Sequence, residues 1–167
     1  GENARRCVTG ANNAVLDGFT LTNGASAYGA GIFCYNTAPE IRNCFLINNT
    51  ASSSGGGIRC ENTLTQSPRI VNCVIANNRA PVEGGGISVW VDSLVDISFC
   101  TIANNTGAGV FNHNGLCKIY SGVVWGNSSG GIVNTGGGAL EVYYSIVQGG
   151  YAGFEGNLDA DPLFWDA

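Results

Sequence analysis

The stretch Gly55-Gly56-Gly57-Ile58-Arg59-Cys60, followed by Ile70-Val71-Asn72-Cys73-Val74-Ile75-Ala76-Asn77-Asn78, decides the fold because it recurs along the chain. Close copies, each a glycine cluster followed by a segment ending in Asn-Asn, occupy 84–87 with 97–105 and 29–32 with 41–49. Looser copies lie at 107–110 with 119–127 and at 130–132 with 142–150, and a half-copy lies at 16–24. Such repetition predicts a solenoid, a propeller or an array.

The length of the repeat separates these architectures. The apolar residue after each glycine cluster serves as a marker, and successive markers are 22 to 29 residues apart: Ile32, Ile58, Ile87, Val110 and Ile132. A propeller blade needs roughly 40 residues, and the L-x-x-L-x-L frame of leucine-rich repeats is missing. Period-two alternation, as in 58–61, predicts short strands. We therefore predict an all-β fold, a right-handed single-stranded parallel β-helix (solenoid) of about six coils stacked roughly 4.8 Å apart.

Stacked coils bring equivalent positions into rows, so the repeat also predicts the core. One inward row holds the five markers. A second holds Phe19, Cys44, Cys73, Cys100, Gly122 and Ser145, and a third holds Leu21, Leu46, Ile75, Ile102, Val124 and Val147. At one turn lie Asn49, Asn78, Asn105 and Asn127. An Asn there tolerates left-handed dihedrals, and its side-chain amide can bond the coils above and below.

The seven cysteines allow two interpretations. Cys44, Cys73 and Cys100 share an inward row, which favours small buried hydrophobic groups. Cys34 and Cys60 each lie two residues after a marker, and neighbouring coils bring Cα atoms within disulfide range, so a Cys34–Cys60 bridge is the alternative. The sequence contains no Cys-x-x-Cys, which argues against a zinc site.

Composition argues against several classes of function. The 167 residues carry a net charge of −5 and only 7 scattered basic residues, so no nucleic-acid partner is expected. No apolar run approaches the roughly 20 residues that span a bilayer, so no membrane span is expected either. No charged-then-apolar signal peptide opens the sequence, and its first residues already follow the coil pattern. We therefore expect a piece of a longer protein.

By its length the chain is one domain. Residues 1–150 carry the coils, whereas residues 151–167 contain several large apolar side chains and no repeat. An open solenoid end exposes core and unpaired strand edges. We therefore expect this tail to cap the last coil, and an uncapped end to allow end-to-end or side-by-side self-association.

Three segments carry a family resemblance: residues 16–24, the repeats at 29–49, 55–78 and 84–105, and the end of the chain, where 143–150 run into Gly156-Asn157-Leu158-Asp159-Ala160-Asp161-Pro162-Leu163-Phe164. In these the chain resembles right-handed parallel β-helix repeat proteins with the pectate-lyase-like fold, above all a bacterial secreted or surface group with G-G-G-I…N-C-x-I-x-x-N repeats. The resemblance implies the fold and an extracellular or cell-surface location in a bacterium. It implies little about function, because such folds host lyases, hydrolases, adhesins and tailspikes.

Alternation places two sets of side chains outside the first strand of each coil. At marker plus one these are Phe33, Arg59, Ser88, Phe111 and Val133, and at marker plus three they are Tyr35, Glu61, Trp90, His113 and Thr135. Aromatic rings can stack on the apolar faces of sugars, while polar neighbours bond their hydroxyls. We predict a glycan-binding groove made of Tyr35, Arg59, Glu61, Trp90, Asp92, Phe111 and His113. Ordinary exposed strand residues are the alternative.

Support for catalysis is weaker. A glycosidase needs two carboxylates, and the predicted groove supplies Glu61 with Asp92 at its margin. A lyase of the resembled fold would use clustered acids to hold Ca²⁺ and an Arg or Lys base. Arg59, Glu61 and His113 are therefore the catalytic candidates. The alternatives are a surface Arg59–Glu61 ion pair worth under ~1 kcal/mol and a histidine without a chemical role.

A calcium site is a further hypothesis. Asn157, Asp159 and Asp161 alternate along the tail, and side-chain oxygens are the ligands that Ca²⁺ prefers. The segment lacks the glycine and the distal Glu of an EF-hand loop, and these side chains could equally cap turns. Otherwise no cofactor is expected.

Three functions remain open from the sequence. The favoured one is a non-catalytic β-helix module of a secreted or cell-surface protein, which binds polysaccharide or serves as a rigid scaffold. The second is a polysaccharide lyase or glycoside hydrolase acting on acidic glycans at the same outer face. The third is ice binding, which needs a flat regular array of threonines, and the outward positions are too mixed for one.

Overall fold

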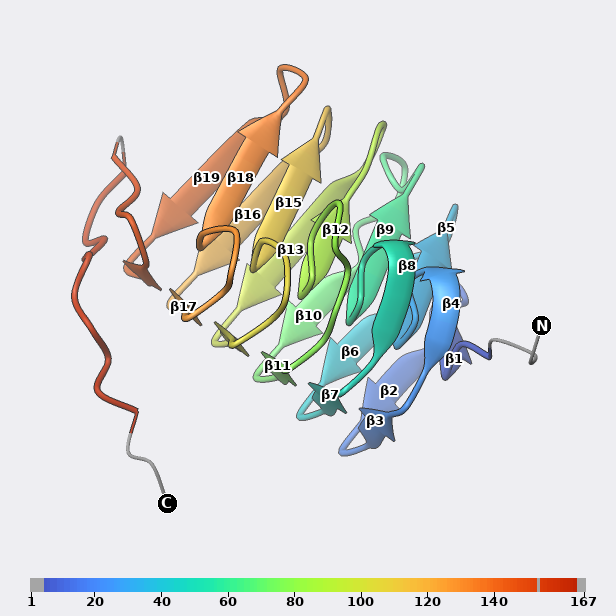
Figure 1. Ribbon diagram of the computed structural model, residues 1–167. Helices are drawn as coiled ribbons and strands as arrows, with labels where there is room; N and C mark the ends of the chain where they lie inside the picture. The colour runs from blue at the N-terminus through green and yellow to red at the C-terminus, as the bar shows by residue number, and fades with distance from the viewer. Residues whose placement is uncertain (1–4, 153, 165–167) are drawn as a thin grey trace.

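The chain winds into one column of stacked coils. A computed structural model describes residues 5–152 and 154–164, and Figure 1 shows strands gathered into long sheets that run along the column. Three sheets have six strands each, a fourth has two, and strands that are neighbours in a sheet belong to successive coils. The predicted parallel β-helix of about six coils is therefore confirmed.

Each coil gives one strand to each large sheet. Sheet A contains β1 (Val8–Thr9), β5 (Ile32–Tyr35), β9 (Ile58–Glu61), β12 (Ile87–Val89), β15 (Val110–His113) and β18 (Ile132–Thr135). Sheet B contains β2 (Val15–Asp17), β6 (Glu40–Arg42), β10 (Arg69–Val71), β13 (Leu94–Ser98), β16 (Leu116–Tyr120) and β19 (Ala139–Tyr143). Sheet C contains β3 (Thr20–Thr22), β7 (Phe45–Ile47), β11 (Val74–Ala76), β14 (Thr101–Ala103), β17 (Val123–Trp125) and β20 (Ile146–Val147). The short fourth sheet pairs β4 (Ala25–Tyr28) with β8 (Thr50–Ser54).

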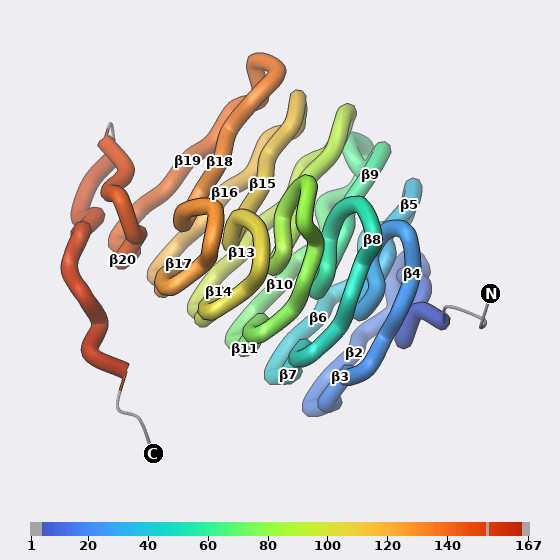
Figure 2. Tube along the Cα trace, viewed as in Figure 1, coloured from blue at the N-terminus to red at the C-terminus, as the bar shows by residue number. Residues whose placement is uncertain are grey.

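Strand register follows the sequence repeat. Ile58 pairs with Ile32 on one side and with Ile87 on the other, and the same row continues to Val110 and Ile132. The first four members of this row are fully buried. Each coil thus covers the apolar edge of the next, which is the main favourable term in folding. Figure 2 shows the resulting path, with one turn of the chain per coil.

The two other predicted core rows also form. Their members after the first coil are buried, from Leu46 to Val147 in one row and from Cys44 to Ser145 in the other. Phe19 is the exception, because its side chain is 55% exposed. Among the described residues only the coil of β6 and β7 pairs with this corner, so one side of the Phe19 ring stays uncovered.

A ladder of buried asparagines ties the coils together. Asn49 Nδ2 donates to Asn78 Oδ1 at 3.0 Å, Asn78 Nδ2 to Asn105 Oδ1 at 3.1 Å, and Asn105 Nδ2 to Asn127 Oδ1 at 2.9 Å. Each Nδ2 also bonds a main-chain carbonyl of the preceding coil, and each Oδ1 accepts a main-chain N–H. The predicted ladder is confirmed.

The left-handed dihedral belongs to the residue before each ladder asparagine, which corrects our assignment. Asn48, Asn77 and Asn104 have φ of 57°, 57° and 56°, and Gly126 takes the same place in the next coil. The preceding residue turns the chain, so the ladder side chain can point inward along the column. An Asn-Asn pair therefore serves two separate roles, since the first asparagine makes the turn and the second makes the hydrogen bonds.

Thiols form a second ladder at the corner between sheets B and C. Cys73 Sγ lies 3.6 Å from the carbonyl oxygen of Ile41, and Cys100 Sγ lies 3.5 Å from that of Ile70. Cys100 Sγ also accepts the main-chain N–H of Cys73 at 3.5 Å. These cysteines therefore bond the backbone of the neighbouring coil, in addition to filling the core as small apolar groups.

The Cys34–Cys60 disulfide is not formed, so that alternative is wrong. All seven cysteines are free, and six of them are buried. Cys34 and Cys60 do pair in register, but their thiols stay separate, and hydrogen bonding with Cys34 together with burial raises the pKa of Cys60. Equivalent side chains on stacked strands run side by side into the core, and close Cα atoms alone do not meet the geometry of a disulfide.

Thiol labelling should distinguish the two cysteine environments. We expect one of the seven thiols, Cys7, to react promptly with an aromatic disulfide reagent in the folded protein, because it is the exposed one. All seven should react in denaturant without any reductant. Cys7→Ser should abolish the prompt phase. A deficit of two thiols in non-reducing denaturant would show that a disulfide exists after all.

The segment after β20 lies on the last coil. The Asn157 side chain accepts the N–H of Ser145 at 3.1 Å and donates to the carbonyl of Val142 at 2.7 Å. Leu158 forms a parallel bridge with Ile146. Phe154 packs edge-on against Tyr143 with ring centroids 4.9 Å apart. These contacts satisfy backbone groups at the end of the column, while Trp165 and the last two residues lie outside the described part of the chain.

Candidate functional site

The outward side chains of sheet A form two parallel rows, which we call the outer strip. It consists of Phe33, Tyr35, Arg59, Glu61, Ser88, Trp90, Phe111, His113, Val133 and Thr135, drawn from β5, β9, β12, β15 and β18 and the residue after β12. Register pairing places these side chains one coil apart along the column. The structure therefore brings the predicted groove residues of sheet A together on one face.

Arg59 is the centre of the strip, and it is not a surface residue. Only 5% of it is exposed. Its Nη2 lies 3.0 Å from Glu61 Oε2, and another guanidinium nitrogen bonds Ser54 Oγ. Since Arg59 is buried, the expected weak surface ion pair is corrected to a desolvated one, in which removal of one partner leaves an uncompensated charge.

Aromatic rings cover both faces of this guanidinium. The Arg59 Cζ atom lies 4.6 Å from the ring centroid of Tyr28 and 4.7 Å from that of Trp90. Cation–π contacts of this kind are stronger where water is excluded. Arg59 is thus held by an acid, a hydroxyl and two rings, which come from three successive coils.

The rings of the strip stack on one another along the column. Trp90 and His113 have centroids 4.5 Å apart at 27°, and Trp90 and Phe111 are 6.2 Å apart at 21°. Arg59 in the coil before Trp90 and His113 in the coil after it therefore occupy the two faces of the indole. Trp90 presents an edge to the outside, whereas Tyr35 is 53% exposed. We therefore expect Tyr35, not Trp90, to offer a ring face to a ligand.

His113 and Asp92 lie at the margins of this arrangement. His113 Nδ1 is 3.0 Å from Thr135 Oγ1 in the next coil. Asp92 is exposed in the turn after β12 with φ of 54°, where its main-chain carbonyl accepts the N–H of Leu64 at 2.9 Å. Both positions are compatible with contact to a ligand that follows the strip.

Glu83 is a member of the site that sequence reasoning missed. It forms a parallel bridge with Ser54, whose hydroxyl accepts from Arg59. Burial raises the pKa of the Glu83 carboxyl, and the nearby charges of Arg59 and His113 only partly oppose this. Among the described residues Glu83 takes part in no ion pair.

A signal for Glu83 was present in the sequence. Tyr28, Ser54 and Glu83 each lie four residues before a marker, so they form a third row beside the outer strip. Alternation identifies outward positions only within the strands after the markers. This row lies before the markers and the glycine clusters, so alternation did not reveal it.

The three calcium candidates each accept a main-chain hydrogen bond, which closes a turn for Asp161 and ties the tail to the end of the last coil for Asn157 and Asp159. Oδ1 of Asn157, Asp159 and Asp161 accept the main-chain N–H groups of Ser145, Gly149 and Leu163, at 3.1, 3.0 and 2.9 Å. In the described part of the chain no group of three or more His, Cys, Asp or Glu side chains is placed to hold a metal ion. The calcium site therefore stays a prediction, and the described residues supply no converging set of acidic ligands for it.

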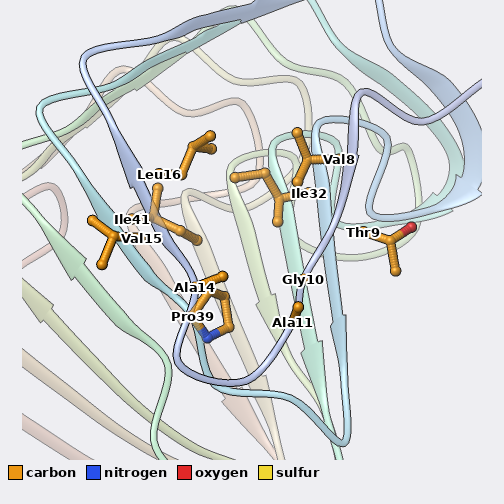
Figure 3. A pocket seen from close by; sticks show the side chains of 10 residues that line it. All are labelled: Val8, Thr9, Gly10, Ala11, Ala14, Val15, Leu16, Ile32, Pro39 and Ile41. Atoms are coloured by element: carbon orange, nitrogen blue, oxygen red, sulfur yellow. The ribbon is translucent and has the colours of Figure 1, made fainter.

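An apolar hollow lies away from the strip, at the N-terminal end of the column. The pocket has a volume of about 90 Å³. Figure 3 shows its lining, where the side chains of Val8, Leu16, Ile32 and Ile41 come together. Its lining is apolar, and it contains none of the predicted site residues. It is the incompletely covered end of the core.

Comparison with known families agrees with this geometry. Residues 6–147 match the model of the right-handed β-helix region, which covers nearly all of the coils. The protein belongs to the right-handed β-helix family. No curated protein and no solved structure matches the chain.

Membership of this family means that the β-helix is right-handed. It does not specify a function, because function depends on the side chains of a particular site. Within residues 5–152 and 154–164 no helix is long and apolar enough to cross a bilayer. The outer strip, with Glu83 beside it, brings acids, a base and aromatic rings together on one face of this β-helix. We therefore take it as the candidate functional site.

Proposed function

We propose that this protein is a non-catalytic β-helix module, part of a secreted or cell-surface protein, that binds polysaccharide along the outer strip. The observation that carries the proposal is the one-per-coil register of polar and aromatic side chains over five strands of sheet A. A linear polymer repeats along its length, as the strip does, so the same contacts can recur from coil to coil.

The stacked ladders support a role as a rigid support for this strip. The asparagine ladder spans four coils with hydrogen bonds near 3 Å. Buried and fully satisfied polar networks hold their members in one geometry. A preformed surface loses less entropy on binding than a flexible one, which favours affinity for an extended ligand.

The state of Arg59 supports binding over lyase chemistry. A base must be free to take a proton from the substrate, and a site for acidic sugars needs a cation with free donors. Arg59 instead bonds Glu61 and Ser54 and lies between two rings. Each of its three nitrogens contacts an acceptor within the protein.

Hydrolysis is a second candidate, favoured by one observation. Glu83 has a raised pKa through burial, which is the property of a general acid. Release of reducing ends from glycans, lost in Glu83→Gln, would establish a hydrolase. Unsaturated products seen by ultraviolet absorbance would establish a lyase. Binding to a glycan array without either product would support the module.

Tyr35→Ala should weaken glycan binding about fivefold, because it removes the exposed ring of the strip and a stacking contact contributes ~1 kcal/mol. The matched control is Phe45→Ala on β7, whose ring is 51% exposed on sheet C. Calorimetric titration with the best ligand from the array measures both variants. Equal losses in the two variants would place the binding surface elsewhere.

A further inference from the structure

We propose that the outer strip selects glycans that carry ammonium groups, as polymers of unacetylated amino sugars do, and disfavours acidic glycans. This inference rests on the proposed function and names its ligand class. It depends on the charges beside β9 and β12, where Arg59, Glu61 and Glu83 lie.

The single cation at the centre of the strip is already neutralised. Arg59 Nε and Nη2 lie 3.1 and 3.0 Å from Glu61 Oε2, and the other terminal nitrogen bonds Ser54. Tyr28 and Trp90 cover the two faces of the guanidinium. A uronate carboxylate would find no free fork of donors here, although such a fork is what makes arginine a strong carboxylate ligand.

Glu83 presents the opposite situation. It is a half-buried carboxylate without an ion-pair partner among the described residues. Partial burial of an unpaired charge is unfavourable, and a ligand cation that lies against it relieves that cost. An ammonium group supplies both the charge and three hydrogen-bond donors.

Ser88 gives an independent indication that this part of the strip lacks a partner. It lies in register between Arg59 and Phe111 on the outer side of sheet A, because its neighbours Ile87 and Val89 point into the core. The residue is fully buried, and its Oγ has no hydrogen-bond partner. A ligand ammonium or hydroxyl would satisfy this oxygen once it displaced the side chains that cover it.

The balance of charge points the same way. With Asp92 exposed at the margin, the strip and its edge hold three carboxylates, Glu61, Glu83 and Asp92. Against them stand the paired Arg59 and, at the β5 end, Arg6, whose Cζ lies 4.6 Å from the Phe33 ring centroid. Acidic chains are therefore repelled and cationic chains attracted, an effect that salt weakens. A neutral sugar chain gains only the hydrogen bonds and the stacking on Tyr35.

Affinity should depend on pH through both partners. The complex needs Glu83 ionised and the sugar amine protonated, so binding should rise as pH increases through the raised pKa of Glu83 and fall where the ammonium loses its proton. Arg59 on β9 and His113 on β15 face Glu83, and Glu61 faces Arg59. Protonation of His113 would also repel an ammonium, so His113→Asn separates its effect from that of Glu83.

Calorimetry with three matched hexasaccharides tests the proposal: glucosamine, N-acetylglucosamine and galacturonic acid. We expect the glucosamine hexamer to bind about tenfold more tightly than the acetylated one, and the galacturonate hexamer to bind least. Glu83→Gln should remove the tenfold preference and the low-pH limb of the affinity profile. Glu155→Gln, the same charge change at the far end of the column, should preserve both.

The outcomes separate this inference from the proposed function. If the acetylated or the acidic hexamer binds as tightly as glucosamine, or if the preference survives in Glu83→Gln, the ligand class is wrong while glycan binding stands. If no hexamer binds and the glycan array is also blank, the proposed function itself fails.

Discussion

Asn78→Ala is expected to lower the free energy of unfolding by about 3–6 kcal/mol, because it breaks the asparagine ladder at its centre. The change leaves the main-chain N–H and the Nδ2 group of Asn49 without their acceptor, and the carbonyl of Leu46 without its side-chain donor. The main-chain N–H of Asn49 is left unsatisfied, which costs ~1–3 kcal/mol, and each further hydrogen bond lost costs ~0.5–1.5 kcal/mol, although Asn49 Nδ2 keeps its bond to the Leu21 carbonyl.

Asn77→Gly is the matched control for this substitution. Asn77 is exposed and left-handed, with φ of 57°, and glycine adopts that conformation without strain. We expect a change below about 0.5 kcal/mol. Urea unfolding followed by far-ultraviolet circular dichroism measures both variants. If Asn78→Ala were as mild as this control, the ladder would not be what holds the coils together.

Gly86→Ala is expected to be the second most damaging change, with a loss of about 3 kcal/mol. A Cβ atom at Gly86 would lie 2.5 Å from the carbonyl oxygen of Gly109 and 2.8 Å from Cγ2 of Ile102. The first contact is with the backbone of the next coil, which cannot move without disturbing sheet A. Overpacking of this kind typically costs ~1–3 kcal/mol and more where the backbone must shift.

Gly122→Ala provides the comparison within the same fold. Gly122 belongs to the row of Cys100 and Ser145, whose other buried members carry side chains, and the closest atom to its added Cβ would be Ile119 Cγ2 at 3.3 Å. We expect a change within about 1 kcal/mol in either direction. Thermal unfolding of the two alanine variants gives the result. Similar melting temperatures would mean that the glycine clusters are not required by close contact between coils.

These two predictions also show why the architecture was readable from sequence. The constraint at Gly86 recurs at Gly57, where an added Cβ would lie 2.7 Å from the carbonyl of Gly86. The hydrogen bonds of Asn78 recur at Asn49 and Asn105. Each coil packs against its neighbours in the same way, so the same residue types recur at equivalent positions along the chain.

The candidate site was readable only in part. Its membership along the strands followed from alternation, which placed Arg59, Trp90 and His113 on one face. Alternation predicts on which face of a strand a side chain lies, but not whether neighbouring side chains cover it. The burial of Arg59 and the covering of both faces of the Trp90 indole were therefore missed. Glu83 was missed because it lies before its marker, outside the strands in which alternation identifies the outward positions.

The solenoid, its strand register and its inward rows follow from the order of residues, since these depend on local alternation and on like residues meeting in successive coils. The state of each side chain follows from how the folded coils pack. This packing kept Cys34 and Cys60 apart, neutralised Arg59 and gave Glu83 no ion-pair partner within residues 5–152 and 154–164. These outcomes depend on distances between atoms of different coils and on the exclusion of water, and the spacing of residues along the chain carries neither quantity.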